Sequence, residues 1–344
     1  MKALHGRGRP VLIFALSVVA SLAIFVGFAV WYVTATPGAS HRGPLPPLDA
    51  DGKRLAENLK AHVIAVASEE HNFAHPEALE RSARYIEKTL SGLGYAVSRD
   101  EFETEDIKVR NLEVSRTGPG TRKARLIVIG AHYDSALGAV GADDNGSGVA
   151  ALLELARFLK AVRPAEGLEV RLVFYVNEEL PWFGTDKMGS YVHSKSLARE
   201  GREVVAMLSL ETIGWYSDAP QSQRYPFPFS LFYPSTGDFI AFVANLRSRN
   251  LMHRVIGSFR GGASLPSEGG AAPEFIPGVD WSDQWAYWTF GWPAVMVTDT
   301  APFRYPYYHT LRDTPEKLDY ERLARVVKGL EDVLRDLASG EPDR

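Results

Sequence analysis

Two short, almost continuous apolar runs limit the folds that this chain can adopt. They are ARLIVIG at residues 124–130 and VRLVFYV at residues 170–176. Runs rich in β-branched and aromatic residues are typical of strands buried on both faces of a sheet. Between them, apolar residues recur at helical spacing from Val149 to Leu159, and Ser147 is placed to cap that helix. We therefore predict a strand–helix–strand unit with parallel strands.

The rest of the chain continues this alternation. Apolar periodicity predicts further helices at 55–66, 76–93 and 320–337, and further strands at 95–102, 109–114, 204–210 and 293–298. This order predicts an α/β fold, a three-layer α/β/α sandwich with a mixed, mostly parallel central sheet. A length of 344 residues is sufficient for one large domain of this kind.

The N-terminal region predicts a membrane anchor. Residues 11–33 contain no charged residue and are long enough to cross a bilayer, which takes about 20 residues as a helix. Cleaved signal peptides have a shorter apolar region of roughly 7 to 15 residues, so we expect one uncleaved transmembrane signal anchor. The basic flank at 1–10 predicts a cytoplasmic N-terminus, with the remaining chain periplasmic or extracellular.

Residues 34–47 contain four prolines and two glycines, and we expect an extended linker there. The globular domain then comprises residues 48–344. The formal net charge is only −4, without a block of like charge, which argues against nucleic acid as a partner. The chain has no cysteine, so any metal ion must be held by nitrogen and oxygen ligands.

Acidic residues and a histidine follow the predicted strands where each strand ends. His132 and Asp134 lie just beyond the first apolar run, Glu178 and Glu179 just beyond the second, and Glu211 at the end of 204–210. Ligand sites in open α/β sheets lie at the carboxyl ends of the strands. We therefore expect these side chains to gather at one edge of the sheet.

The loop GADDNGSG at 141–148 adds two aspartates, Asp143 and Asp144, between glycines that permit tight turns. A carboxylate has two oxygens and can bridge two ions. Two histidines and three carboxylates can hold a pair of divalent ions, while a neighbouring acid handles protons. The candidate ligands are His132, Asp144, Glu179, Glu211 and His309.

Five motifs in this order resemble the co-catalytic zinc aminopeptidase family, which also contains glutamate carboxypeptidases and relatives of glutaminyl cyclase. The resemblance covers roughly residues 55–337, and the ordered set is far more specific than any one motif. The motifs are HYDS at 132–135, GADDNGSG at 141–148, NEE at 177–179, LETIG at 210–214 and YHTLRDTPEKLDY at 308–320.

The resemblance implies two zinc ions, although other divalent ions would suit the same ligands. It implies that Asp144 bridges the ions, that His132 and Glu211 complete the first site, and that Glu179 and His309 complete the second. Metal identity stays open, because the best-known members carry Asp at the position of Glu211.

The resemblance also implies roles for three neighbouring residues. Glu178 is the expected general base, which takes a proton from water and passes it to the leaving amine. Asp134 is expected to hydrogen-bond the outer imidazole nitrogen of His132 and so fix its tautomer. Tyr308 is a candidate donor to the developing oxyanion. A histidine often follows Ser282 and Asp283 in the family; here the residue is Gln284, and we expect no loss of activity from that difference.

The leading hypothesis is a membrane-anchored zinc aminopeptidase that acts on peptides. A carboxypeptidase of the same fold is a close competitor and needs a cationic clamp, for which Arg254, Arg260 and Arg304 are available. A glutaminyl cyclase-like acyltransferase and a non-catalytic ectodomain are further alternatives. The sequence leaves the preferred N-terminal residue, the physiological substrate and the oligomeric state open.

Five aromatic residues are candidates for a pocket that receives a hydrophobic substrate side chain. Packing within the core explains them equally well. They are Trp182, Phe183, Trp215, Tyr216 and Trp285.

Overall fold

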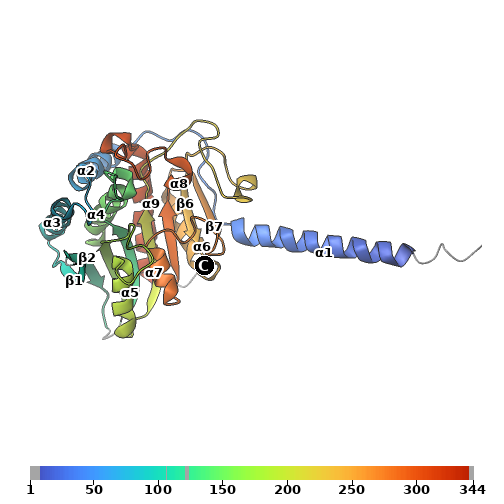
Figure 1. Cartoon of the computed structure of the whole chain (residues 1–344), viewed down its shortest axis with the longest axis horizontal. Coiled ribbons are helices and arrows are strands. Elements are labelled where there is room, and N and C mark those ends of the chain that lie inside the picture. The colour runs from blue at the N-terminus through green and yellow to red at the C-terminus, as the bar shows by residue number, and fades with distance from the viewer. Residues whose placement is uncertain (1–7, 106, 121–123, 341–344) are drawn as a thin grey trace, which may run out of the picture. The chain divides into compact units, whose positions relative to one another are not determined.

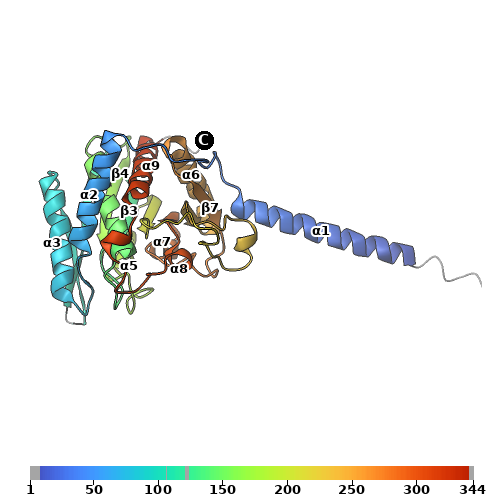
Figure 2. The ribbon, with the colours of Figure 1, turned by 90° about the horizontal axis from the view of Figure 1, so that it is seen from above.

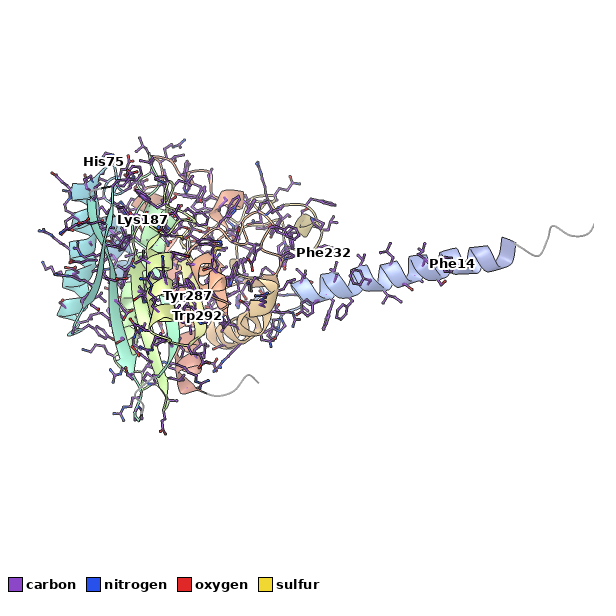
Figure 3. The ribbon with its side chains drawn as sticks, turned by 60° about the horizontal axis from the view of Figure 1, so that its bottom comes forward. Phe14, His75, Lys187, Phe232, Tyr287 and Trp292 are labelled. Carbon is purple, nitrogen blue, oxygen red and sulfur yellow. The ribbon has the colours of Figure 1, made fainter. Side chains whose placement is uncertain are left out.

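The computed structural model describes residues 8–105, 107–120 and 124–340. The chain divides into two compact units, Met1–Ala35 and Thr36–Arg344. The first contains helix α1 (Gly8–Thr34), whose labelled Phe14 projects outward from the helix (Figure 3). By length and composition, Leu16–Thr34 is apolar enough to cross a membrane, and a signal sequence near an N-terminus would meet the same criteria.

The second unit is built on one eight-stranded sheet (Figure 1). Across the sheet, its strands follow the order β1 (Ser98–Thr104), β2 (Ile107–Thr117), β4 (Leu168–Tyr175), β3 (Arg125–His132), β5 (Val204–Glu211), β8 (Ala294–Thr298), β6 (Ile240–Ala244) and β7 (Ser267–Ala271).

The sheet is mixed, as predicted. Four neighbouring pairs are parallel, namely β3 with β4, β3 with β5, β5 with β8, and β6 with β7. Three are antiparallel, namely β1 with β2, β2 with β4, and β6 with β8. Every residue of β3 after Arg125 is buried, which agrees with an apolar run covered on both faces.

Helices cover both faces of the sheet and give the predicted three layers (Figure 2). Helix α3 (Pro76–Gly92) packs on α2 and β2. One face carries α2 (Ala50–Val66), α4 (Gly148–Leu159), α6 (Arg249–Gly262) and α9 (Tyr320–Ser339). The other face carries α5 (Gly189–Arg199) and α7 (Gln284–Thr289).

The ends of α2 and α9 follow from local chemistry. The Asp49 side chain accepts a hydrogen bond from the main-chain N–H of Gly52 at the start of α2, and Asp319 accepts one from Arg322 at the start of α9. Such caps satisfy main-chain donors that have no partner inside the helix. Gly340 ends α9 with φ 70°, a left-handed conformation that glycine adopts without steric cost.

A buried polar cluster ties α5 and α7 to the sheet. The hydroxyl of Tyr287 on α7 lies 2.7 Å from the hydroxyl of Tyr175 on β4 and 2.7 Å from Nδ1 of His193 on α5. Tyr287 also packs against Trp292, with ring centroids 6.0 Å apart (Figure 3). The three polar groups of this cluster therefore satisfy one another where α5 and α7 cover the sheet.

The segment expected to be an extended linker is attached along the second unit from Thr36 onward. Arg260 of α6 donates to the hydroxyl of Thr36 at 2.9 Å and to the carbonyl of Pro37 at 2.8 Å. The main-chain N–H of Ser267 donates to the hydroxyl of Ser40 at 2.8 Å. Residues 36–47 are therefore part of the folded unit, whereas the sequence suggested a spacer.

Candidate metal centre

The predicted ligands gather at the carboxyl ends of neighbouring parallel strands. His132 is the last residue of β3 and Glu211 is the last residue of β5. Glu178 and Glu179 follow the end of β4. Asp144 comes from the turn η1 (Ala142–Ser147), which precedes α4. His309 comes from the segment after α8 (Ala301–Arg304).

These side chains form two trios that share one carboxylate. In the first, His132 Nε2 lies 3.3 Å from Asp144 Oδ1 and 3.2 Å from Glu211 Oε2. In the second, His309 Nε2 lies 3.0 Å from Asp144 Oδ2 and 3.3 Å from Glu179 Oε1. The ligand atoms of each trio lie within 4.8 Å of one another. Asp144 thus offers one oxygen to each trio.

The separations fit divalent cations. Tetrahedral zinc with bonds of about 2.0 Å holds its ligand atoms about 3.3 Å apart. Three atoms of the trios are buried and make no hydrogen bond, namely His132 Nε2, Asp144 Oδ1 and Glu179 Oε1. A buried polar atom without a partner is costly, and a bound cation would satisfy all three.

The crowding of acidic groups also indicates a cation site. Burial and the charge of Asp144 raise the pKa of Glu179 to about 7 and also raise the pKa of Glu211. Burial is the largest cause that raises the pKa of Glu178. Burial lowers the pKa of His309, but the neighbouring carboxylates of Asp144 and Glu179 outweigh this effect and raise it to about 10. So many carboxylates favour the ionised state together only when cations neutralise them.

The expected hydrogen bond between Asp134 and His132 comes from the main chain of Asp134. The nitrogen Nδ1 of His132 lies 3.0 Å from the main-chain carbonyl of Asp134, which is placed to accept its proton. The Asp134 carboxylate instead accepts from the main-chain N–H groups of Glu178, at 3.1 Å, and Glu179, at 3.2 Å. One residue therefore orients the imidazole with its main chain and the two glutamates with its side chain.

We expect Asp134→Asn to reduce kcat/KM by about 10- to 100-fold, the usual cost of losing a group that supports metal ligands. Asparagine keeps one oxygen, so one of the main-chain N–H groups of Glu178 and Glu179 would face an amide NH2, and the glutamates would shift. The measurement is steady-state hydrolysis beside metal content per chain. Unchanged kinetics with full metal content would show that the main-chain carbonyl of Asp134 suffices.

Asp313 fixes the ligand turn, and sequence reasoning assigned it no role. Its carboxylate accepts from the main-chain N–H groups of Asp143 at 2.9 Å and Asp144 at 3.1 Å, and from the hydroxyl of Tyr305 at 2.8 Å. These bonds tie η1 to the segment that carries His309. The position of Asp313 within the YHTLRDTPEKLDY motif was the available signal.

Asn145 and Ser282 position the first trio. The amide oxygen of Asn145 accepts from Gly148 at 3.1 Å and Thr212 at 3.2 Å, and its nitrogen donates to Leu210 at 2.8 Å. Asn145 therefore joins η1 to the end of β5. It also makes the bond at the start of α4 that was expected from Ser147, whose side chain makes no capping bond.

The hydroxyl of Ser282 donates to Glu211 Oε2 at 2.7 Å and so orients this ligand.

Asp143, the neighbour of Asp144, lies outside both trios. Its Oδ1 accepts from the main-chain N–H of Gly214 at 2.8 Å. Burial, followed by the charge of Asp299, raises its pKa well above the usual range. Asp143 is therefore directed away from the ligands, and Asp144 is the aspartate that both trios share.

The two remaining predicted residues lie beside the ligands. Glu178 Oε2 is 3.8 Å from His132 Nε2, outside both trios. The ring of Tyr308 stacks on that of His309 with centroids 3.9 Å apart. Burial, followed by the charge of Asp144, raises the pKa of Tyr308, so its phenol stays protonated and can donate a hydrogen bond.

None of the five aromatic candidates lines the pocket that opens beside Glu211 and Tyr308. Four of them pack against other rings instead, and Tyr216 lies beside the guanidinium groups of Arg304 and Arg322. Phe183 packs on Trp285, with centroids 6.1 Å apart, and Trp215 packs on Tyr305 at 5.4 Å.

Comparison with known proteins places this geometry in a family. Residues 113–334, which include every predicted site residue, match peptidase family M28. The uncharacterized protein YfbL of Escherichia coli K12 is 42% identical over 261 residues, which are 73% of this chain and 78% of YfbL. Aminopeptidase YwaD of Bacillus subtilis 168 is 27% identical over 239 residues, which are 68% of this chain and 47% of YwaD. This chain thus spans about half of YwaD.

Solved structures share the fold. An aminopeptidase from Aneurinibacillus sp. strain AM-1 superimposes with a TM-score of 0.63 at 17% identity, covering 85% of this chain and 96% of that one. The glutaminyl cyclase of Fimbriiglobus ruber gives 0.61 at 20% identity, covering 88% and 99%. The family match over most of the globular unit confirms the resemblance seen in the motifs: the chain belongs to peptidase family M28 and is a zinc metallopeptidase.

Proposed function

We propose that this protein is a membrane-anchored aminopeptidase that binds two zinc ions and removes N-terminal residues from peptides. The observation that carries the proposal is the carboxylate of Asp144, which offers one oxygen to His132 and the other to His309. A shared carboxylate between two complete ligand groups is suited to a pair of ions. The same ligands would also accept other divalent metals.

Bound zinc supplies Lewis acidity, which lowers the pKa of water and polarises the peptide carbonyl. The residues supply the remaining steps. Glu178 accepts the proton of the attacking water and delivers it to the leaving amine. Tyr308 donates a hydrogen bond to the carbonyl oxygen as negative charge develops there. The carboxylate of Asp134 keeps Glu178 in position by accepting a hydrogen bond from the main-chain N–H of Glu178.

Two observations favour an aminopeptidase over a carboxypeptidase. The acidic centre suits the free ammonium of a peptide N-terminus. The three arginines considered for a carboxylate clamp have partners elsewhere: Arg254 donates to Asp336, Arg260 to Ser267, and Arg304 to the carbonyl of Phe239. YwaD and the superimposed structure from Aneurinibacillus are also named aminopeptidases.

A glutaminyl cyclase-like acyltransferase is the second candidate, because a glutaminyl cyclase shares the fold. The experiment uses the full chain in detergent, purified without chelator. Metal ions are counted per chain while free and N-acetylated aminoacyl substrates are assayed. We expect two zinc ions and hydrolysis of free-amine substrates only. One ion with cyclisation of N-terminal glutamine would identify the acyltransferase, and a chain without metal and turnover would be a binding ectodomain.

We propose further that α1 anchors the protein in the cytoplasmic membrane, with residues 36–344 on the extracytoplasmic side. The support is an apolar helix at Leu16–Thr34 that follows a basic flank. We expect the full chain to stay in the membrane fraction after an alkaline wash, and mass spectrometry to find α1 intact.

The control for this anchor is a chain that lacks residues 1–35, which should become soluble because Thr36–Arg344 forms a compact unit. Protease added to the outside of spheroplasts should digest the second unit of the full chain. A mature protein that begins after α1 would show a cleaved signal instead.

A further inference from the structure

A pocket of about 130 Å³ lies beside the metal centre. Glu211 and Tyr308 are among its lining residues, so the pocket opens directly onto the ligands. Its remaining walls come from β6, β7 and β8, from the loops at 212–239 and 272–283, and from residues 300–303. A substrate bound at the metal centre can therefore extend a side chain into this space.

Aromatic rings form much of the wall. Tyr225 stacks on Tyr233 with centroids 5.8 Å apart, and Trp281 stacks on Phe303 at 6.2 Å. Both tyrosine hydroxyls donate to main-chain carbonyls, at 2.7 and 3.0 Å. These phenol groups are therefore satisfied within the wall, and the pocket gains apolar and π surface that suits a long alkyl chain or a cation.

Glu268 lies at the far end of a row of residues across the sheet. Glu211 on β5 pairs with Thr298 on β8, Thr298 pairs with Ala241 on β6, and Ala241 pairs with Glu268 on β7. All four line the pocket, as expected because paired residues face the same side of a sheet. Three strand spacings of about 4.8 Å separate the two glutamates by about 14 Å.

Glu268 is the charged wall residue that the metal centre does not use. Among the lining residues, Glu211 and Glu268 carry charge, and there is no lysine or arginine. Within the described residues, the Glu268 carboxylate makes no hydrogen bond or ion pair. A half-buried carboxylate without a partner in an aromatic pocket is suited to a cation brought by a ligand.

The charges around Glu268 are compatible with binding a cation from a ligand. Burial raises the pKa of Glu268, and Asp238 adds to this effect, whereas Arg260 and Arg42 oppose it. Arg260 does not line the pocket, and it donates to the hydroxyl and carbonyl of Ser267 and to the segment at 36–38. All of these partners are neutral groups, so Arg260 acts on Glu268 through its charge and forms no ion pair with it.

We infer that Glu268 determines specificity, and that the enzyme prefers peptides whose N-terminal residue has a long cationic side chain, lysine or arginine. This inference rests on the proposed aminopeptidase function. The alkyl stem packs between the aromatic rings, and the cationic end reaches the carboxylate of Glu268 across the pocket. The rings add a favourable interaction with the cation.

The test compares substrates with one leaving group and different N-terminal residues on the full chain in detergent. For wild type, kcat/KM for lysine and arginine should exceed that for norleucine, which has an uncharged chain, by about tenfold or more. In Glu268→Gln, this ratio should fall to about one because lysine and arginine substrates are lost, while norleucine changes by less than about twofold.

The matched control is Glu274→Gln in the neighbouring loop. The Glu274 carboxylate accepts from Asn245 at 2.8 Å and does not line the pocket, so the lysine-to-norleucine ratio should stay as in wild type. A wild-type ratio near one, or a Glu268→Gln variant that keeps its preference for lysine, overturns the inference.

Calorimetry with free L-lysine and L-norleucine gives a second readout that needs no turnover. Wild type should bind lysine at least about tenfold more tightly, and Glu268→Gln should bind both equally. If no free-amine substrate is hydrolysed, the proposed function fails, and the two amino acids still decide whether Glu268 recognises a cation. Equal binding by wild type contradicts the inference independently of activity.

Discussion

The variant Glu178→Gln is expected to lose about 10²- to 10⁴-fold in kcat, the usual contribution of a general acid–base residue. The amide keeps the shape of the side chain but cannot take a proton from water. Glu178 lies outside both ligand trios, so both zinc ions should remain. The main-chain bond from residue 178 to Asp134 does not depend on the side chain and should persist.

The measurement for Glu178→Gln is single-turnover hydrolysis of a free-amine substrate, with metal content and melting temperature measured on the same sample. Removing one negative charge from a crowded acidic centre should leave the melting temperature unchanged or slightly higher. Glu57→Gln, the same change on the exposed side of α2, is the control and should match wild type. A loss of activity accompanied by loss of an ion would instead make Glu178 a ligand.

The variant Asp144→Asn is expected to weaken binding of both ions together and to lower kcat/KM by about 10³-fold, which corresponds to about 4 kcal/mol of transition-state stabilisation. The reason is that each oxygen of Asp144 faces a different histidine, His132 or His309. Asparagine keeps one oxygen, loses the charge and turns a nitrogen toward one of the trios.

The neighbouring variant Asp143→Asn is a stringent control, because the chemical change is identical and the position differs by one residue. Burial and Asp299 raise the pKa of Asp143, which favours the neutral carboxyl, and an amide resembles that form. We expect its activity to stay within a few-fold of wild type. An equal loss of activity in both variants would show that the turn η1 tolerates no change. It would contradict the proposal that Asp144 serves both ions.

Zinc removal supplies the stability readout for Asp144→Asn. A ligand that binds only the folded state raises the melting temperature with its concentration. Chelator should therefore lower the melting temperature of wild type and Asp143→Asn, and it should change Asp144→Asn little. A wild type that is insensitive to chelator would contradict a buried centre built to hold two ions.

Much of the fold was predictable because the signals were local. The runs at 124–130 and 170–176 became β3 and β4, and the helical spacing after Ser147 became α4. Strands β6 (IAFVA) and β7 (SEGGA) were missed. They are short, and β7 has no apolar alternation, so pairing with neighbouring strands rather than intrinsic preference makes them strands.

The residues of the metal centre were likewise predictable from polar groups that follow buried strands. The supporting bonds were not. The sequence predicted a hydrogen bond between Asp134 and His132, but not that the Asp134 carboxylate would also hold the main chain of Glu178 and Glu179. Asp313 reaches the main chain of Asp144 from 169 residues away. Hydrogen bonds between such distant segments depend on how strands and loops pack, which no local pattern records.

The sequence by itself determined the alternation of helices and strands, the apolar N-terminal helix and the residue types available to bind metal. The reason is that hydrophobic periodicity and strand-end chemistry act over a few neighbouring residues. Only the tertiary structure showed the role of Asp143, whose carboxylate is directed to Gly214 and Asp299. It also brought Glu268 into the same row as Glu211, because strand order across the sheet is fixed by packing between distant segments.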